Sequence, residues 1–317
     1  MTTGRYILRK LLHGIPLLFG VTFVSFLLMV YAGADQAYEL AGKNPDPRVL
    51  EEVRSQLGLD RPFLARYAEY LRELATLDLG RSFTSGERVS DLLARTLPVS
   101  LLLVLPGFVL GNLAGIALGM LAAWRRGRWL DRVVTSASVV GMSLSFVVII
   151  IGLQVLLCTP WGLDWFPPRG WNVTGLVSWF EYATVPTLAL VLVTLGYNTR
   201  FYRAVLAEEL GRDHVTTLRA FGASPAEILL RHALRNALIP IVTRIAFSLP
   251  LVVVSGSLLL ESYFGIPGIG LVTFEAITGG DQPVLKAVVG LTAVLFVLAQ
   301  TLTDVFYRLV DPRVGAR

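Results

Sequence analysis

The feature that most constrains this sequence is a set of apolar runs, each long enough to cross a lipid bilayer. A spanning helix needs about 20 mostly apolar residues. Charged residues inside the runs are few and lie toward the predicted ends, because a charge at mid-bilayer costs about 2.5–3.5 kcal/mol; they include Arg200, Arg244, Lys286 and Asp304. The pattern predicts an all-α membrane protein with about six transmembrane helices: Leu11–Tyr31, Leu97–Ala123, Val133–Cys158, Ala183–Phe201, Leu238–Leu260 and Val284–Tyr307.

The amino-acid composition also indicates a protein surrounded largely by lipid. Of the 317 residues, 54% are hydrophobic and only 16% are charged, whereas soluble domains carry about 25% charged residues. Cys158 is the only cysteine, so a disulfide framework is excluded. The net charge of +5 is spread along the chain. Since it is not gathered into one patch, nucleic acid is not an expected partner, whereas membrane lipid is.

The first apolar run has a second interpretation, as a secretory signal sequence. Arg5, Arg9 and Lys10 precede it, and the sequence Ala-Gly-Ala at 32–34 follows it like a cleavage site. A signal core is typically about 7–15 residues long, and this run is longer. We therefore expect a retained helix.

Basic residues predict which connections face the cytoplasm, because Lys and Arg concentrate on that side. Both chain termini and the connections 124–132 and 202–237 are rich in arginine, whereas 159–182 holds one basic residue and 261–283 holds none. Both termini and the two arginine-rich connections are therefore expected in the cytoplasm.

The long segment 32–96 is expected on the outer face of the membrane. It is mixed in charge, and two parts of it have amphipathic patterns, Pro47–Leu57 and Pro62–Leu74. These parts are predicted to be short helices that pack on the outer surface. The whole chain is otherwise a single transmembrane domain, 1–317.

The connection 202–237 carries signals for two short helices joined by a tight turn. Asp213 is suited to cap a helix over His214–Phe221, and Gly222 supplies the left-handed residue that ends it. We call residues 213–235 the helical hairpin.

The second helix of the hairpin has a complete set of start signals. Ser224 is suited to cap it, Pro225 fits its first position, and Glu227 completes a capping box. A rigid pair of helices is therefore expected between two apolar spans.

The first helix of the hairpin presents a surface that fits two kinds of contact. Val215, Leu218 and Phe221 are expected to share an apolar face, while Thr217 and Ala220 are small enough to admit the groove of another protein. An amphipathic helix at the membrane surface, with its basic residues near lipid head groups, has the same pattern. The residues alone leave both interpretations open.

Several stretches of the sequence resemble landmarks of one family. Residues 231–240 read RHALRNALIP, which resembles the end of the cytoplasmic coupling loop in ATP-binding-cassette importer permeases, and specifically in the dipeptide/oligopeptide/nickel permease group. Other landmarks of that group have counterparts, in order, along nearly the whole chain: Leu57–Pro62, Asp78–Phe83, Phe166–Gly170, Phe264–Gly270 and Asp311–Arg313.

Three positions depart from the family pattern. Thr216–Leu218 stands where such permeases have a Glu-Ala-Ala triplet, and Arg235 stands where many have a proline. Ser143–Phe146 replaces a stretch of the third span in which relatives often have a proline. The usual reason to expect a kink there is therefore missing.

The resemblance implies a transport subunit that has no catalytic residues and no cofactor. In that family two permeases form the pathway, two ATPase subunits dock on their coupling helices, and an external binding protein delivers the substrate. A heterodimer of permeases in a bacterial or archaeal cytoplasmic membrane is expected. The chain itself has no G-x-x-x-x-G-K-[S/T] phosphate loop, since its only Gly-Lys pair, Gly42-Lys43, is followed by Asn44.

The same resemblance assigns roles to named residues. Gly211 and Pro240 are expected to act as hinges at the edges of the hairpin, and Arg203, Arg212, Arg219 and Glu227 to add ion pairs with the ATPase. The residues expected to meet the ATPase are Asp213, His214, Thr217, Leu218, Ala220, Phe221, Gly222, Ala223, Ser224, Pro225 and Glu227.

The outer side offers a candidate gate and an acidic surface. The glycines of the turn after the fifth span permit tight re-entrant backbone where protein or water satisfies it; the gate residues are Gly265, Pro267, Gly268 and Gly270. Glu261, Glu275 and Asp281 make this connection acidic. A solvated surface is expected, and contact with a binding protein or a cationic substrate group is the alternative.

Gln154 and Asn198 are the best candidates for the pathway or the subunit seam, because they are larger and harder to bury than the serines of the spans. No apolar run holds His, Cys or carboxylates at metal-ligand spacing, so no metal site is expected. His13 is expected to pack at a helix end near the interface.

Two other classes of function were weighed against a permease. An ion- or proton-coupled secondary transporter would show inverted repeats and midplane carboxylates, and an intramembrane enzyme would need a Ser/His, Asp/Asp or metal constellation. Neither pattern is present. Within the favoured class the sequence leaves dipeptides, longer peptides, glutathione-like compounds and nickel complexes open, with peptides first.

Overall fold

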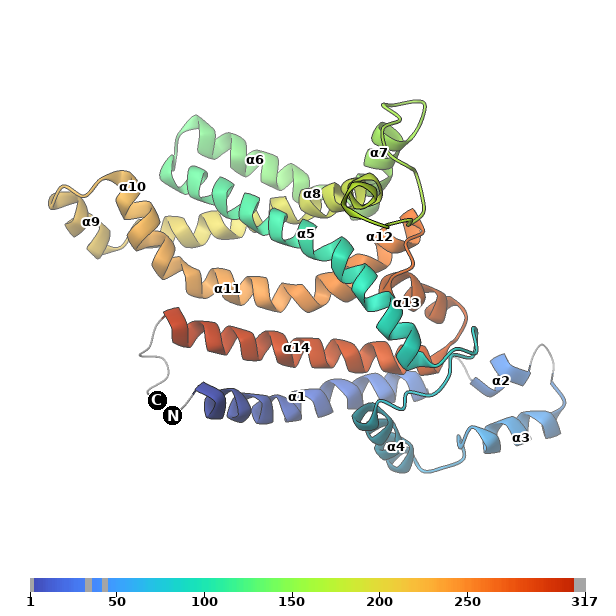
Figure 1. Cartoon of the computed structure of the whole chain (residues 1–317). Helices are drawn as coiled ribbons and strands as arrows, with labels where there is room; N and C mark the ends of the chain where they lie inside the picture. The colour runs from blue at the N-terminus through green and yellow to red at the C-terminus, as the bar shows by residue number, and fades with distance from the viewer. Residues whose placement is uncertain (1–2, 32–35, 42–44, 311–317) are drawn as a thin grey trace.

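A computed structural model describes residues 3–31, 36–41 and 45–310, and in these residues every regular element is a helix. The sequences 32–34, Gly42-Lys43 and Asp311–Arg313 lie outside the described residues. The helices (Figure 1) are α1 Thr3–Tyr31, α2 Gln36–Ala41, α3 Pro47–Gln56, α4 Phe63–Thr76, α5 Val89–Trp124, α6 Trp129–Ser143, α7 Phe146–Cys158, α8 Leu176–Glu209, α9 Asp213–Ala220, α10 Pro225–Glu227, α11 Leu234–Leu251, α12 Ser257–Phe264, α13 Ile269–Thr278 and α14 Gln282–Val310, with π-helical turns at Ile228–Ala233 and Val252–Gly256.

The prediction of about six transmembrane helices in an all-α fold is confirmed. By length and apolar composition, five helical runs of the described chain can cross a membrane: Gly14–Tyr31, Val89–Trp124, Leu176–Glu209, Pro225–Phe264 and Gln282–Tyr307. The third predicted span, 133–158, is not straight. It is divided between α6 and α7, which meet at 97°.

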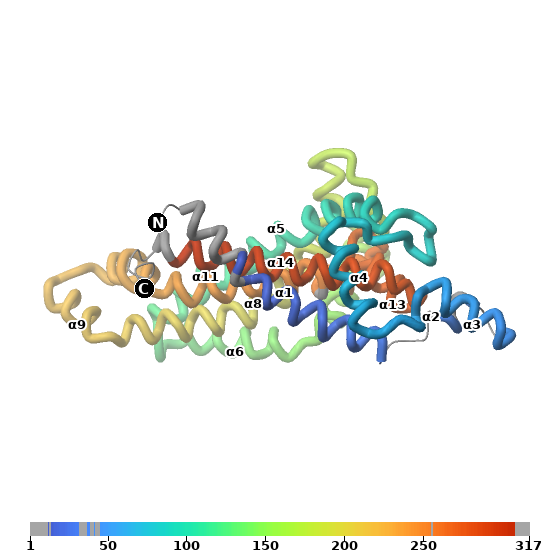
Figure 2. Tube along the Cα trace, turned by 90° about the horizontal axis from the view of Figure 1, so that it is seen from below, coloured from blue at the N-terminus to red at the C-terminus, as the bar shows by residue number. Residues whose placement is uncertain are grey.

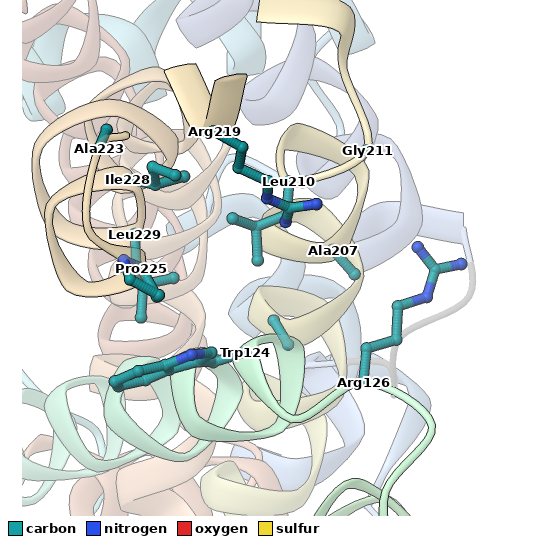
Figure 3. Close-up of a pocket in the computed structure, with 11 residues that line it drawn as sticks. Trp124, Arg126, Ala207, Leu210, Gly211, Arg219, Ala223, Pro225, Ile228 and Leu229 are labelled. Carbon is teal, nitrogen blue, oxygen red and sulfur yellow. The ribbon is translucent and has the colours of Figure 1, made fainter. Parts of the chain in front are cut away.

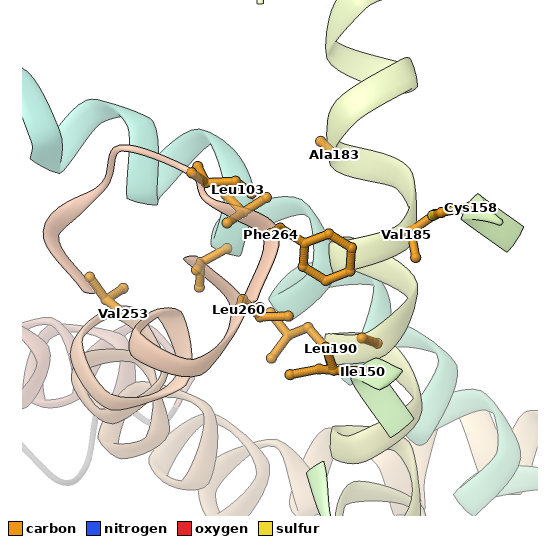
Figure 4. Close-up of a cluster of buried hydrophobic side chains, with 12 residues drawn as sticks. Leu103, Ile150, Cys158, Ala183, Val185, Leu190, Val253, Leu260 and Phe264 are labelled. Carbon is orange, nitrogen blue, oxygen red and sulfur yellow. The ribbon is translucent and has the colours of Figure 1, made fainter. Parts of the chain in front are cut away.

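The bend between α6 and α7 forms without a proline. Leu144 and Ser145 are extended, with ψ of 132° and 140°, and the Ser143 hydroxyl donates to the Val139 carbonyl at 2.9 Å. Serine side chains compete in this way with the backbone bonds of a helix. Beyond the bend, Ile150 and Cys158 of α7 are buried in a cluster with side chains from α5, α8 and α12 (Figure 4).

The second helix of the hairpin and the fifth span are continuous, although the sequence predicted two helices. α10, α11, α12 and the two π-helical turns form one run of 40 residues, Pro225–Phe264. Pro240 lies inside α11 and not at a helix border. Proline is tolerated inside membrane helices because neighbouring groups satisfy the backbone that it leaves free.

The helices sort to two ends of an elongated bundle (Figures 1 and 2). The hairpin helix α9, the start of α1, the end of α14 and the turn between α5 and α6 lie at one end, and α2, α3, α4 and α13 lie toward the other. The charge pattern predicts this same grouping for the inner and outer faces. Which end faces the cytoplasm stays a prediction.

The outer segment contains the two predicted helices, as α3 and α4, together with the short α2. Tyr67 and Tyr70 of α4 pack on Phe26 of α1, with ring centroids 5.7 and 5.5 Å from that of Phe26. The Tyr67 hydroxyl lies 3.0 Å from the Thr22 hydroxyl, and α1 runs along α14 (Figure 1). These contacts make α1 a part of the bundle, as expected for a retained helix.

α5 and α8 run in the same direction and touch along a stripe of glycines. On α5, glycine recurs every four residues and therefore on one face, at Gly107, Gly111, Gly115 and Gly119. A Cβ atom at Gly119 would lie 2.9 Å from the backbone nitrogen of Arg203, and one at Gly115 would lie 2.8 Å from the Asn198 Cβ. Small residues at this spacing let two membrane helices approach closely.

Candidate functional site

The helical hairpin begins with α9, which starts one residue earlier than predicted. Arg212 is the capping residue, with extended backbone (φ −75°, ψ 153°), and Asp213 is the first residue of the helix. The prediction of Asp213 as the N-cap is therefore wrong. A carboxylate in the first turn still favours the helix N-terminus through its charge, while Arg212 binds the Glu209 carboxylate at 2.8 Å.

The end of α9 forms at Gly222, as predicted. Gly222 has φ of +82°, which favours glycine because it has no Cβ. Its N–H donates to the Arg219 carbonyl, and the N–H of Ala223 donates to the Leu218 carbonyl, both at 3.0 Å. These are the two hydrogen bonds of a Schellman motif.

The second helix of the hairpin starts with the predicted Ser224 cap. The Ser224 hydroxyl accepts a hydrogen bond from the Glu227 N–H at 3.2 Å, and Pro225 occupies the first helical position. The prediction that the Glu227 side chain completes a capping box is wrong, because its carboxylate turns toward Arg231, 3.8 Å from the guanidinium. Both ends of the turn are therefore fixed by local hydrogen bonds, which makes the turn rigid.

The outward surface of the hairpin has a large apolar side chain at the end of α9. Phe221 is 85% exposed, whereas Val215 is fully buried, so the prediction that Val215 and Phe221 share one face is wrong. Thr217 and Ala220 are exposed beside Phe221, and Leu218 and His214 are half-buried. The other predicted contact residues are exposed or half-buried as well: Asp213, Gly222, Ala223, Ser224, Pro225 and Glu227.

Behind the hairpin is a hollow of about 530 Å³. Figure 3 shows Trp124 of α5 along one side, Leu210 and Gly211 at the end of α8, and Pro225 and Leu229 of the hairpin opposite them. Gly211 lies in the turn from α8 to α9, where its N–H donates to the Glu208 carbonyl at 3.0 Å. The hairpin therefore meets α5 and α8 across an incompletely packed contact.

Arg203 does not lie on the surface of the hairpin, where a docking role was predicted. Its guanidinium forms a two-pronged ion pair with Asp131 of α6, including a bond of 2.7 Å from Nη2 to Oδ2. The same carboxylate accepts the N–H of Gly127 at 2.8 Å. Since Asp131 is buried, this pair fixes the α5–α6 turn to α8.

The outer turn between α12 and α13 is built around Glu261. The carboxylate accepts hydrogen bonds from the N–H groups of Gly270 and Leu271, at 2.6 and 3.0 Å, and from the Ser100 hydroxyl of α5 at 2.6 Å. Gly265 has φ of +66° and ends α12. The predicted gate residues Gly265, Pro267, Gly268 and Gly270 thus form a compact turn around a carboxylate.

The expectation of an acidic outer surface is wrong for two of its three residues. Glu261 is fully buried and Asp281 is buried as well, whereas Glu275 is exposed. The Asp281 carboxylate accepts the Ser82 hydroxyl at 2.5 Å and the Thr84 N–H at 3.1 Å. Buried carboxylates need such partners, and here the partners come from segments distant in the sequence.

Asn198, one of the two pathway candidates, belongs to a buried polar cluster. Its Nδ2 atom donates to Asn112 Oδ1 at 3.2 Å, and the Tyr202 hydroxyl donates to the same oxygen at 2.5 Å. The Arg244 Nε atom of α11 donates to Asn198 Oδ1 at 3.4 Å. Asn112, Tyr202 and Arg244 were not among the predicted site residues; the signal for Arg244 was a charge inside an apolar run.

Gln154, the other pathway candidate, binds the connection 159–175, which follows α7. Its Nε2 atom donates to the Pro168 carbonyl at 2.6 Å. Arg169 next to it donates to the carbonyls of Tyr263 and Ser262 at 3.0 and 3.3 Å. The connection is thereby fixed to both α7 and α12.

Comparison with known proteins covers both halves of the chain. The family described as "Binding-protein-dependent transport system inner membrane component" matches residues 115–316, and the family described as its N-terminal membrane component matches residues 3–104.

Full-length relatives and one solved structure agree with these matches. A protein of Brucella abortus (strain 2308) that carries the provisional name of a peptide transport system permease protein is 33% identical over 97% of this chain and 98% of its own length. The glutathione transport system permease protein GsiC of Escherichia coli (strain K12) is 32% identical over 98% of each chain. A chain of the MetNI methionine ABC transporter, in an inward-facing conformation, has a similar fold, with a TM-score of 0.56 and 21% identity over 69% of this chain and 96% of that chain.

Proposed function

Since the chain belongs to the family of binding-protein-dependent transport system inner membrane components, we propose that it is the permease subunit of an ATP-driven importer of dipeptides or oligopeptides. The observation that carries this proposal is the match over nearly the full length of relatives named for peptide and glutathione transport. The chain is a multi-pass membrane protein, and we place both termini and the helical hairpin in the cytoplasm. This subunit is non-catalytic, and ATP hydrolysis belongs to separate partner subunits.

The proposed assembly contains two ATPase subunits, a second and different permease, and an external substrate-binding protein. The helical hairpin is the proposed docking element for an ATPase. Its exposed Phe221, with Thr217 and Ala220 beside it, gives the end of α9 a compact surface in which a large apolar side chain has small neighbours. A buried aromatic side chain is a common energetic centre of protein interfaces.

Closure of the ATPase pair would displace the hairpin relative to the spans. The hollow behind the hairpin leaves space for such displacement, and Gly211 at the end of α8 is the proposed hinge on that side. Pro240 is the proposed hinge in α11, where it removes one backbone hydrogen bond. At the other end of the bundle, the turn Gly265–Gly270 is the proposed outer gate.

The test is copurification of the complex in mild detergent, followed by transport in liposomes. A phosphate-loop ATPase and a second permease should copurify with the tagged chain, and ATP should drive uptake of peptides delivered by the binding protein. Ala220→Trp should abolish retention of the ATPase, because it adds bulk at the docking surface. Ala68→Trp is the matched control, since Ala68 is also an exposed alanine, on α4 at the opposite end.

Two results would contradict the proposal. Retention of the ATPase at wild-type levels by Ala220→Trp would place the docking surface elsewhere. A chain that purifies alone and moves solute without ATP would instead be an ion- or proton-coupled secondary transporter.

A further inference from the structure

Arg244 is a charged residue inside the fifth predicted span, 238–260. It lies six residues beyond the predicted inner end of that span, about 9 Å at 1.5 Å per residue, within the helical run Pro225–Phe264. Its neighbours belong to α8: Nε donates to Asn198 Oδ1 at 3.4 Å, and the guanidinium carbon lies 4.7 Å from the centroid of the Phe201 ring. These contacts orient the guanidinium, but neither partner carries a negative charge.

A guanidinium at this depth calls for an anionic partner. Among the residues that the structure describes, Arg244 forms no ion pair with a carboxylate. By contrast, Arg203, five residues after Asn198 on α8, is paired with Asp131. Charged side chains inside membrane spans are costly and usually face a water-filled route or a partner. The face of α11 that carries Arg244 is therefore not a lipid-facing surface.

Arg244 lines an open hollow of about 740 Å³ on that face. Phe201, Phe247 and Leu251 form apolar walls, and Thr243 and Ser248 add hydroxyl groups. Phe247 and Leu251 are 44% and 52% exposed. An open, mostly apolar hollow of this size with one fixed charge has the lining of a small-molecule site, with one side left for another surface to cover.

We propose that Arg244 binds the carboxylate of the transported solute as it passes through the pathway. The guanidinium offers a planar pair of donors that matches a carboxylate, and the aromatic walls suit the apolar groups attached to it. The inference rests on the proposed function, since it assigns the anion to a peptide substrate. It narrows the substrate class to solutes that carry a free carboxylate next to apolar groups.

A solute fits the hollow better than a lipid does. The phosphate of a lipid lies at the membrane surface, whereas the Arg244 guanidinium is held inside the bundle against Asn198, a member of the buried cluster with Asn112 and Tyr202. Asn198 and Phe201 also hold the guanidinium in place before any ligand arrives. Pre-orientation of this kind reduces the entropy that binding must overcome.

The experiment uses the complete transporter in liposomes, with its binding protein outside and ATP inside. The probes are a library of tripeptides with free carboxyl termini and the same library as C-terminal amides, and mass spectrometry measures uptake of each. In the wild type, the carboxylate library should be taken up in preference to the amides. Arg244→Gln should reduce this carboxylate-to-amide ratio about tenfold, as loss of a charged hydrogen bond predicts. Arg244→Lys, which keeps the charge but loses the planar donors, should lie between them.

Arg200→Gln is the matched control, because Arg200 is exposed on α8 next to Phe201 and loses the same charge. It should leave the carboxylate-to-amide ratio unchanged.

Other outcomes would overturn the inference or reassign Arg244. An unchanged carboxylate-to-amide ratio in Arg244→Gln would overturn the inference, and loss of anionic lipid from that variant at an unchanged ratio would assign Arg244 to lipid. Loss of the second permease from both Arg244 variants would assign Arg244 to the subunit seam. If the wild type takes up neither library, the proposed peptide substrate fails and the inference fails with it.

Discussion

Glu261 caps a helix other than its own. It belongs to α12, yet its carboxylate accepts the N–H groups at the start of α13 and the hydroxyl of Ser100 on α5. The first N–H groups of a helix have no partner inside it, and a carboxylate there also meets the positive end of the helix dipole. One buried side chain thus joins three elements at the outer turn.

Glu261→Ala should destabilise the protein by about 2–5 kcal/mol, because it leaves buried donors without an acceptor. The midpoint of thermal unfolding in detergent measures this, and a fall of several degrees is expected. Glu261→Gln keeps one acceptor and should cost less. Glu275→Ala on the exposed face of α13 should leave the midpoint unchanged. Equal midpoints for Glu261→Ala and Glu275→Ala would show that the cap contributes nothing.

For single residues, the sequence predicted hydrogen-bond partners that are close along the chain and missed partners on other helices. The Ser224 cap and the Gly222 stop depend on neighbours within three residues, so their roles follow from spacing alone. Glu261 and Asp131 find their partners on other helices. Their burial could not be predicted from the sequence, because an acidic residue near a span end is as common on a solvated surface.

At the scale of helices, the contact between α5 and α8 depends on the stripe of glycines on one face of α5. The glycines of α5 allow the backbone of α8 to lie against it. Arg203 and Asn198, which make the polar contacts described above, belong to this closely packed part of α8. The glycines recur every four residues in the sequence, although no contact between these two spans was predicted from them. The bend between α6 and α7 was not predicted either, since residues 143–146 contain no proline.

Gly119→Ala should loosen the α5–α8 contact. Its Cβ would lie 2.9 Å from the Arg203 nitrogen, and backbone cannot move aside as a flexible side chain can. Overpacking of this kind costs about 1–3 kcal/mol, so the thermal midpoint should fall. Gly152→Ala on α7 is the control, because nothing lies within 4 Å of its Cβ; it should be neutral or slightly stabilising through helix propensity. A midpoint for Gly119→Ala at or above that of Gly152→Ala would contradict the close contact.

At the scale of the whole molecule, the two most exposed large aromatic side chains among the described residues lie at opposite ends. Phe221 on the helical hairpin is 85% exposed, and Trp161 after α7 is 94% exposed. Of these two aromatic side chains, only Phe221 meets the ATPase in the proposed assembly. In the single chain, Phe221 is therefore exposed because its proposed partner is absent. The sequence alone could not show whether this phenylalanine packs inside the chain or at an interface with another subunit.

Phe221→Ser should weaken retention of the ATPase about tenfold or more, as loss of an aromatic centre of an interface does, with no change in the thermal midpoint of the isolated chain. Quantitative copurification at several detergent and salt concentrations measures the retention. Trp161→Ser removes an equally exposed aromatic side chain at the other end and should have no effect on it. Equal retention by the two variants would exclude Phe221 from the ATPase contact.

The continuous helix 225–264 joins the hairpin at one end of the bundle to the Glu261 turn at the other. Near its middle, Arg244 contacts α8 and the Thr243 hydroxyl contacts Tyr307 of α14. Pro240, the proposed hinge, lies one turn before Arg244, so a push on the hairpin would change the angle between the arm 225–239 and the arm 241–264. The contacts at Arg244 and Thr243 would then act as the fulcrum, and a displacement on one side of the membrane would reach the Glu261 turn on the other side along a single chain segment.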